Sequence, residues 1–213
     1  MNAARFKQTA LLAIALLATI CAPAAAKAPL KLLMFGTSLT QGLGLPPGSE
    51  LPAVLETRLA AGGIQAKVIN AGVSGDTSAD GLSRLDWSLA DRPDAAIVEL
   101  GSNDALRGLD PAITETNIAA VLAKLQSAHI PVLLLGMKAP RNLGPEYAAR
   151  FDAIYPRLAA RYHDMLYPFA LEGVALRPKF NQADGMHPNP AGVQVIATHL
   201  FPYVRRLIAE AHR

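Results

Sequence analysis

Short apolar runs alternate along the chain with longer segments in which apolar residues recur at the helical spacing. The runs predict buried strands over 30–35, 67–70, 95–100, 131–136 and 165–168. The longer segments predict helices over 49–61, 78–89 and 145–163, and two more that begin at 111 and 190. Strands that alternate with helices form a parallel sheet covered on both faces, so the pattern predicts an α/β protein: a three-layer α/β/α sandwich with a parallel sheet of about five strands.

Two residues in the helical segments predict local features, an N-cap and a kink. Ser49 stands where a side chain can accept a hydrogen bond from the first turn, so it is the expected N-cap of the helix over 49–61. Pro156 lies inside the segment 145–163, and its ring both removes an N–H donor and crowds the preceding turn. We therefore expect a kink at Pro156.

Residues 1–26 have the three parts of a secretory signal peptide. Arg5 and Lys7 give a positively charged start, residues 10–21 form an uncharged apolar run, and 24–26 are the small alanines that a signal peptidase accepts. The apolar run is shorter than the roughly 20 residues of a membrane span. We therefore expect residues 1–26 to be cleaved and the mature protein to be periplasmic or secreted, without stable membrane insertion.

Residues 27–213 then have the length of a single domain and contain no cysteine. This suits an oxidising compartment and excludes a disulfide framework or a Cys-rich zinc module. The only cysteine, Cys21, leaves a lipoprotein signal as an alternative, but Ile20 stands where such signals carry a small residue. The net charge of the whole chain is +3, and part of it belongs to the predicted signal peptide. The nearly balanced remainder gives no electrostatic argument for nucleic acid or an anionic membrane as partner.

Four polar segments contain the residue types of nucleophilic catalysis. They cover 36–40, 70–77, 101–104 and 184–188. Ligands of such sheets bind outside the carboxyl ends of the strands, so we expect all four segments to open on one edge. A serine hydroxyl is a weak nucleophile and needs a neighbouring base, and a histidine with a pKa of about 6.5 can remove its proton near neutral pH. A carboxylate can orient that histidine.

In order and spacing, these segments resemble the four sequence blocks of the SGNH hydrolases, also called the GDSL esterase/lipase family. The likeness covers most of the mature chain and is strongest to bacterial periplasmic members that act as thioesterases and lysophospholipases. It implies a flavodoxin-like fold, with Ser38 as nucleophile and Asp184 and His187 completing a catalytic triad. It also implies an oxyanion hole formed by the backbone N–H groups of Ser38 and Gly75 and the side-chain amide of Asn103.

Each of these residues also has a structural interpretation when it is taken alone. Ser38 could be a helix N-cap, Gly75 a turn glycine, Asn103 a helix cap, and Asp184 the first residue of an Asx turn. Asp184 and His187 could also be metal ligands, but no further cluster stands at a useful spacing. Taken together, the pattern favours catalysis, and we expect no metal and no cofactor.

The chain departs from the family motif at Thr37, where Gly-Asp-Ser-Leu has an aspartate. A threonine brings no negative charge, and we expect its hydroxyl to shape the turn through hydrogen bonds to nearby backbone. The departure leaves open a binding module that keeps the fold without turnover. Asp76 and Asp104, beside the expected oxyanion-hole residues, are predicted to be structural partners of the active-site loops.

The resemblance implies a serine esterase that hydrolyses acyl esters and thioesters, of arylesterase, acyl-CoA thioesterase or lysophospholipase type, through an acyl-enzyme on Ser38. Three loops, 105–113, 138–147 and 171–180, should rim the pocket. The predicted substrate-binding residues are Leu106, Arg107, Leu143 and Leu176. Leucines suit an acyl chain, whereas the arginine suits a phosphate, CoA or only solvent. A carbohydrate acetylesterase is the alternative within the family. We expect a monomer whose partner is a small-molecule substrate.

Overall fold

The structure, a computed structural model, describes residues 28–211, so the predicted signal peptide lies outside the described residues. These residues contain a five-stranded parallel sheet in the order β2-β1-β3-β4-β5. The strands are β1 (Leu30–Gly36), β2 (Ala66–Gly72), β3 (Ala95–Val98), β4 (Val132–Leu135) and β5 (Met165–Tyr167). This is the flavodoxin-like strand order, so the predicted fold class is confirmed.

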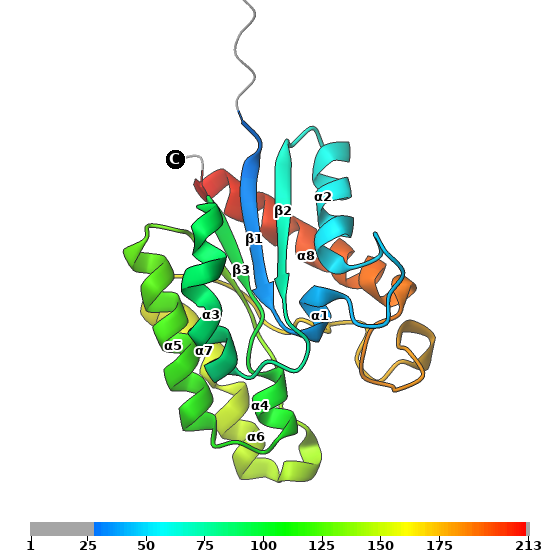
Figure 1. The fold of residues 1–213 in the computed structure, drawn as a ribbon. Coiled ribbons are helices and arrows are strands. Elements are labelled where there is room, and N and C mark those ends of the chain that lie inside the picture. Colours follow the sequence, from blue (N-terminus) through cyan, green and yellow to red (C-terminus); the bar gives the residue numbers. More distant parts are fainter. Residues whose placement is uncertain (1–27, 212–213) are drawn as a thin grey trace, which may run out of the picture.

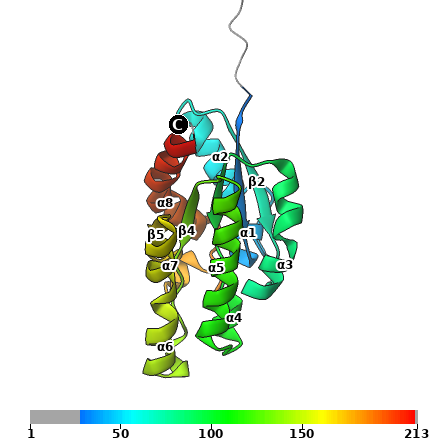
Figure 2. The same cartoon turned by 90° about the vertical axis from the view of Figure 1, so that its left-hand side faces the viewer.

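Helices cover both faces of the sheet (Figures 1 and 2). On one face, α2 (Leu51–Ala61) packs against α8 (Pro190–Ala211). On the other, α5 (Pro111–Ser127) lies between α3 (Ser78–Ser88) and α7 (Ile154–Tyr162). The remaining helices are short: α1 (Ser38–Gln41), α4 (Ser102–Leu106), α6 (Pro145–Asp152), and 3-10 turns at Leu89–Asp91, Arg141–Leu143 and Pro178–Phe180. Within residues 28–211, no helix has both the length and the apolar character to cross a membrane.

The strands in the middle of the sheet are buried along their whole length. Every residue of β3 and β4 is buried, and in β1 only Lys31 is exposed. In β2, an edge strand, only Val68 is fully buried. Because helices exclude water from both faces, a central parallel strand has no polar side, which is why these segments are continuous apolar runs rather than alternating ones.

The two local helix predictions need correction. The N-cap of α2 is Glu50 rather than Ser49, and neither side chain accepts a capping hydrogen bond there. The predicted helix over 145–163 is two helices, and the interruption lies at Ala153 rather than at Pro156. Pro156 is still its cause, because the proline has no N–H for the carbonyl of Asp152 and its ring crowds that carbonyl. The proline instead occupies the first turn of α7, where an N–H is not needed.

Two of the polar segments at the carboxyl ends of the strands are partly helical. The chain leaves β1 at Gly36 and enters α1 at Ser38. It leaves β3 at Val98 and enters α4 at Ser102. Both strands lie at the centre of the sheet, where the chain order reverses between β1 and β3. Crevices at such a reversal are the usual ligand sites of doubly wound sheets.

Candidate active site

Ser38 lies at the carboxyl end of β1, as the first residue of α1. Thr37 is the N-cap, so Ser38 does not have the capping role that its position alone allowed. Its carbonyl accepts backbone hydrogen bonds from Gly42 at 2.9 Å and Leu43 at 3.1 Å, which close the short helix. The residue is 8% exposed. Ser38 is therefore held on a fixed turn and is mostly buried.

His187 lies between Ser38 and Asp184 and contacts both. Its Nε2 is 2.9 Å from Ser38 Oγ, and its Nδ1 is 2.6 Å from Asp184 Oδ2. Asp184 Oδ1 accepts the backbone N–H groups of His187 at 3.0 Å and Met186 at 2.9 Å. The hydrogen bond from the His187 side chain, followed by these two, lowers the pKa of Asp184 to about 2. Asp184 is thus ionised at neutral pH and can stabilise an imidazolium. Asp184 also forms the Asx turn that its residue type predicted, through the hydrogen bond from the Met186 N–H.

Gly75 lies in the loop after β2 with a φ of +86°, a conformation that favours glycine. A Cβ atom at this residue would meet no atom within 4 Å, so the space beside the backbone is open. Arg107 donates from Nη2 to the Gly75 carbonyl at 2.8 Å. On the other side, the Ser74 N–H donates to Oε1 of Gln41 at 2.7 Å. The loop is therefore held by residues from α1 and from the end of α4.

Asn103 lies in α4, and its side chain faces the same loop. Its Nδ2 donates one hydrogen to the Asp76 carbonyl at 2.8 Å. An amide nitrogen carries two hydrogens, so one remains for a further acceptor. The neighbouring Asp104 is buried and accepts the Ser78 N–H at 2.8 Å and the Thr114 hydroxyl at 3.2 Å. This carboxylate joins α3, α4 and α5 next to Asn103, as predicted for a structural partner.

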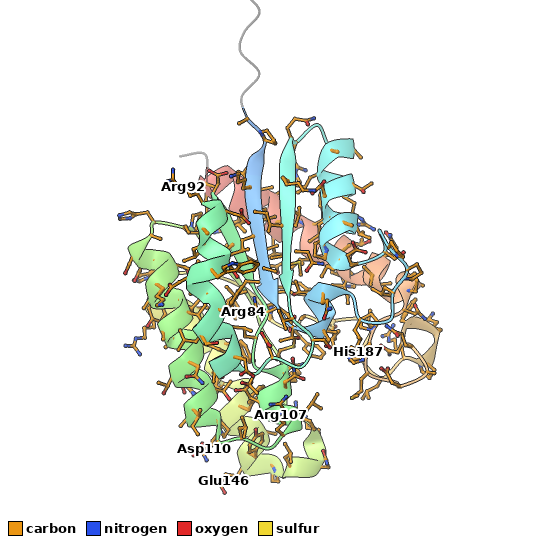
Figure 3. The ribbon with its side chains drawn as sticks, viewed as in Figure 1. Arg84, Arg92, Arg107, Asp110, Glu146 and His187 are labelled. Carbon is orange, nitrogen blue, oxygen red and sulfur yellow. The ribbon has the colours of Figure 1, made fainter. Side chains whose placement is uncertain are left out.

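Arg84 is a component of the site that the sequence analysis missed. From α3, its Nε forms an ion pair with Asp76 Oδ2 at 2.6 Å, confirming Asp76 as a structural partner. Its other nitrogens donate to the carbonyls of Ala71 at 3.0 Å and Gly36 at 2.8 Å, and its guanidinium lies 4.3 Å from the Phe35 ring centroid. Arg84 thus joins the ends of β1 and β2 to the loop of Gly75 (Figure 3). Arg84 lies eight positions after Asp76 and in a different element, and the sequence analysis did not connect the two.

Thr37 does not make the backbone hydrogen bonds expected of it. Its hydroxyl donates to the side chain of Glu99 at 3.1 Å and lies 3.4 Å from the Ser102 hydroxyl. The prediction was wrong because it overlooked Glu99 as an acceptor for the Thr37 hydroxyl. Glu99 was counted as part of the strand over 95–100, but it lies one residue beyond β3. Its side chain there reaches the turn of Ser38.

A cavity of about 630 Å³ opens beside these residues. Leu39, Ser102 and Met186, which are the chain neighbours of Ser38, Asn103 and His187, contribute to its wall. The other lining residues are Leu106, Met137, Lys138, Ala139, Pro140, Arg141, Phe169, Leu171, Ala175, Leu176 and Gly185. Most of these are apolar, and all three loops predicted to rim a pocket contribute. Such a wall fits an apolar group of a ligand that lies beside Ser38.

Two of the four predicted substrate-binding residues line this cavity. Leu106 is 54% exposed and Leu176 is 92% exposed, the latter in the left-handed region with a φ of +60°. Arg107 and Leu143 are not among its lining residues, and Arg107 instead contacts Gly75. Apolar lining residues that the sequence analysis missed, such as Met137 and Phe169, follow β4 and β5. The signal available for them was their place just after predicted strands.

Of the described residues that line the cavity, Lys138 and Arg141 are the charged ones. Arg141 forms an ion pair with Asp152 at 2.7 Å, and the Lys138 ammonium lies 4.7 Å from the Phe169 ring centroid. Among residues 28–211, no three histidine, cysteine, aspartate or glutamate side chains are grouped closely enough to hold a metal ion.

Comparison with known proteins gives concordant matches. The sequence profile of the GDSL-like lipase/acylhydrolase family matches residues 34–195. "Esterase TesA" of Pseudomonas aeruginosa is 40% identical over 178 residues, which are 83% of this chain and 89% of that protein. "Thioesterase 1/protease 1/lysophospholipase L1" of Escherichia coli is 37% identical over 178 residues, which are 83% of this chain and 84% of that protein.

A solved structure gives the same picture. The SGNH-hydrolase family esterase AlinE4 is 48% identical and superposes with a TM-score of 0.72, covering 84% of this chain and 96% of its own. The family match over residues 34–195 includes all four polar segments.

Proposed function

The chain belongs to the GDSL-like lipase/acylhydrolase family and is a serine esterase/thioesterase, and on that premise we propose that Ser38, His187 and Asp184 are its catalytic triad. The observation that carries the proposal is the hydrogen-bonded series from Ser38 Oγ through the imidazole to the Asp184 carboxylate, at 2.9 Å and 2.6 Å. Both distances lie within the range in which a base can accept the proton of its nucleophile.

In the first half of the reaction, Ser38 Oγ attacks the carbonyl carbon of the substrate while its proton moves to His187 Nε2. The carbonyl oxygen becomes an oxyanion, and we assign its donors as the N–H groups of Ser38 and Gly75 and the remaining hydrogen of Asn103 Nδ2. The intermediate then collapses, the bond to the leaving oxygen or sulfur breaks, and His187 gives that atom its proton. The acyl group is left on Ser38.

In the second half, a water molecule takes the place of the leaving group. His187 accepts one proton from the water as its oxygen attacks the acyl carbon, and the same donors stabilise the second oxyanion. Collapse breaks the bond to Ser38 Oγ, which regains a proton from His187. Asp184 stays ionised throughout, because its low pKa reflects hydrogen bonds that the fold itself supplies.

We propose that the substrates carry an acyl chain longer than acetyl. The mostly apolar cavity of about 630 Å³ supports this, since its volume and wall suit several methylene groups. Leu106 and Leu176 would contact the chain at the open side. The same wall argues against a carbohydrate acetylesterase, whose acyl group is small and whose leaving group is polar.

Hydrolysis of a series of p-nitrophenyl acyl esters by the purified protein tests this function, with Ser38→Ala as the matched variant. The proposal predicts turnover that rises from acetate to longer chains and disappears in Ser38→Ala. Equal rates for both proteins would contradict the role of Ser38 and favour a binding module. A maximum at acetate, with hydrolysis of acetylated polysaccharide, would contradict the proposed substrate class.

We also propose that residues 1–26 direct the protein out of the cytoplasm and are then removed. The basic start, the apolar run and the alanines at 24–26 support this. N-terminal sequencing of the exported protein tests it: the proposal predicts a chain that begins at Lys27. A mature protein that still begins at residue 1 would contradict it.

A further inference from the structure

A buried carboxylate lies directly beneath the turn that carries Ser38. Glu99 is 1% exposed, although it follows a strand made only of apolar residues. Its backbone N–H donates to the Phe35 carbonyl at 2.8 Å, which continues the pairing of β3 with β1. Its side chain lines a cavity of about 20 Å³ together with Ser38 and His187. Glu99 therefore has a backbone fixed by the sheet and a side chain next to the proposed catalytic pair.

The carboxylate holds the turn on both sides of Ser38. Oε2 accepts the backbone N–H of Thr37 at 2.9 Å and the hydroxyl of Thr40 at 3.0 Å. The Thr37 hydroxyl lies 3.1 Å from each carboxylate oxygen. Both threonines are fully buried, so water does not compete for these hydrogen bonds. The residue before Ser38 and the residue two positions after it are thus attached to one rigid group.

The space around this carboxylate is filled by the turn itself. A Cβ atom at Gly36 would lie 2.6 Å from Glu99 Oε2 and 2.9 Å from the Glu99 carbonyl oxygen, so only glycine fits where β1 meets the turn. The turn and the side chain of Glu99 therefore have matching shapes, and a shift of one moves the other.

No cation accounts for keeping a carboxylate in this place. Within residues 28–211, none of the ion pairs includes Glu99. Burial raises the pKa of Glu99 to about 7, and the hydrogen bonds of Thr37 and Thr40 oppose that rise. A buried acid without a cation destabilises a fold unless its hydrogen bonds compensate. Its hydrogen bonds instead connect it to Thr37 and Thr40, in the turn that carries Ser38.

We propose that Glu99 is a positioning residue for the nucleophile, which holds Ser38 at hydrogen-bond distance from His187 through Thr37 and Thr40. The inference rests on the proposed function, and it also explains why a threonine can stand at position 37. The family motif has an aspartate at that residue, whereas a threonine supplies a hydroxyl donor to Glu99 without bringing a second negative charge against it. The carboxylate that supports the turn comes from the residue that directly follows β3.

Kinetics of Glu99→Gln test the proposal, because glutamine keeps the shape and loses the charge and one acceptor. Asp164→Asn is the matched control: burial raises the pKa of that carboxyl to about 7 as well, but it lies just before β5, at the other end of the sheet. We expect kcat of Glu99→Gln to fall by about 10- to 100-fold, the range expected for a displaced reacting group, with KM within about twofold of wild type. Asp164→Asn should keep the wild-type kcat.

The rate at which a fluorophosphonate modifies Ser38 gives a second readout, independent of substrate binding. It should fall in Glu99→Gln by a factor similar to that of kcat. If Glu99→Gln fails to fold, Thr40→Val takes its place in the test, because valine removes one hydroxyl donor to Glu99 and keeps the side-chain volume. The kcat of Thr40→Val should fall about threefold or more. Where Glu99→Gln does fold, the losses in the Glu99→Gln/Thr40→Val double variant should not simply add, because both substitutions weaken the contact between Glu99 and Thr40.

A Glu99→Gln protein with wild-type kcat and wild-type labelling rate would overturn the proposal, as would an equal loss in Asp164→Asn. Thr40→Val with full activity would overturn it in the same way. The proposed function is tested separately by Ser38→Ala. Turnover that is lost in Ser38→Ala but unchanged in Glu99→Gln would contradict the positioning role alone.

Discussion

Glu99→Gln should also change how the stability of the fold depends on pH. The pKa of Glu99 is about 7 in the folded protein, against an ordinary value of 4.5, because burial disfavours the charged form. Well below pH 4.5, the folded and unfolded chains both carry the proton. As the pH rises from 4.5 to 7, the unfolded chain loses the proton first, so the folded state is progressively destabilised. Well above pH 7 both states are ionised and the loss is complete.

The size of this effect follows from the two pKa values. Their difference is about 2.5 units, and each unit corresponds to 1.36 kcal/mol, so Glu99 lowers the free energy of unfolding by about 3 kcal/mol between pH 4.5 and 8. Glutamine does not titrate. The variant should therefore gain about 3 kcal/mol relative to wild type over this pH range, whatever its stability at pH 4.5.

Urea unfolding of both proteins at pH 5 and pH 8 measures most of this difference, because the unfolded glutamate has already begun to ionise at pH 5. Asp164, whose pKa burial also raises to about 7, titrates in the same window. Because it is present in both proteins, its contribution cancels in the comparison. A difference in unfolding free energy between Glu99→Gln and wild type that is the same at pH 5 and pH 8 would refute the reasoning, since it would mean that the Glu99 carboxyl titrates alike in both states.

Three further predictions concern the turn, the oxyanion hole and the cavity. Thr37→Asp places a second carboxylate against Glu99, and ionising both of two adjacent carboxylates is costly. The free energy of unfolding of this variant should therefore fall more steeply from pH 5 to pH 8 than that of the wild type. An unchanged pH dependence in urea unfolding would contradict this. Asn103→Ala should lower kcat by about 10²- to 10³-fold with little change in KM. The control Asn117→Ala removes an asparagine that is hydrogen-bonded to Ser78, and it should leave kcat unchanged. Equal losses of kcat in the two variants would argue against Asn103 as an oxyanion donor. Ala175→Phe narrows the cavity, so it should lower kcat/KM for p-nitrophenyl octanoate about tenfold more than kcat/KM for p-nitrophenyl acetate. Equal losses for the two esters would mean that the acyl chain binds elsewhere.

The fold was predictable from the sequence because its central strands are continuous apolar runs. Helices cover both faces of β3 and β4, so every residue of these strands is apolar and the runs have clear ends. The short helices α1 and α4 were not predictable, since four or five residues do not show a helical period. The break at Ala153 was placed three residues late, because proline acts on the carbonyl four residues before it.

The proposed triad was identified from its sequence context, and the structure brings Ser38, His187 and Asp184 into contact. What the sequence did not reveal are the side chains that hold these residues in place. Arg84 and Glu99 contact the active-site loops from elements distant in the chain, and such contacts leave no local pattern. One signal was available for Glu99: a glutamate directly follows an apolar strand, and a charged residue is unusual beside such a buried segment.

Mass spectrometry of the peptide that contains Ser38, after treatment of the protein with a fluorophosphonate, tests the central claim most directly. The reagent forms a stable bond with a serine only where a neighbouring base activates the hydroxyl. The account predicts one phosphonyl group per molecule, located on Ser38, and its loss in His187→Ala. An unmodified Ser38 in the wild-type protein, or equal modification with and without His187, would contradict it.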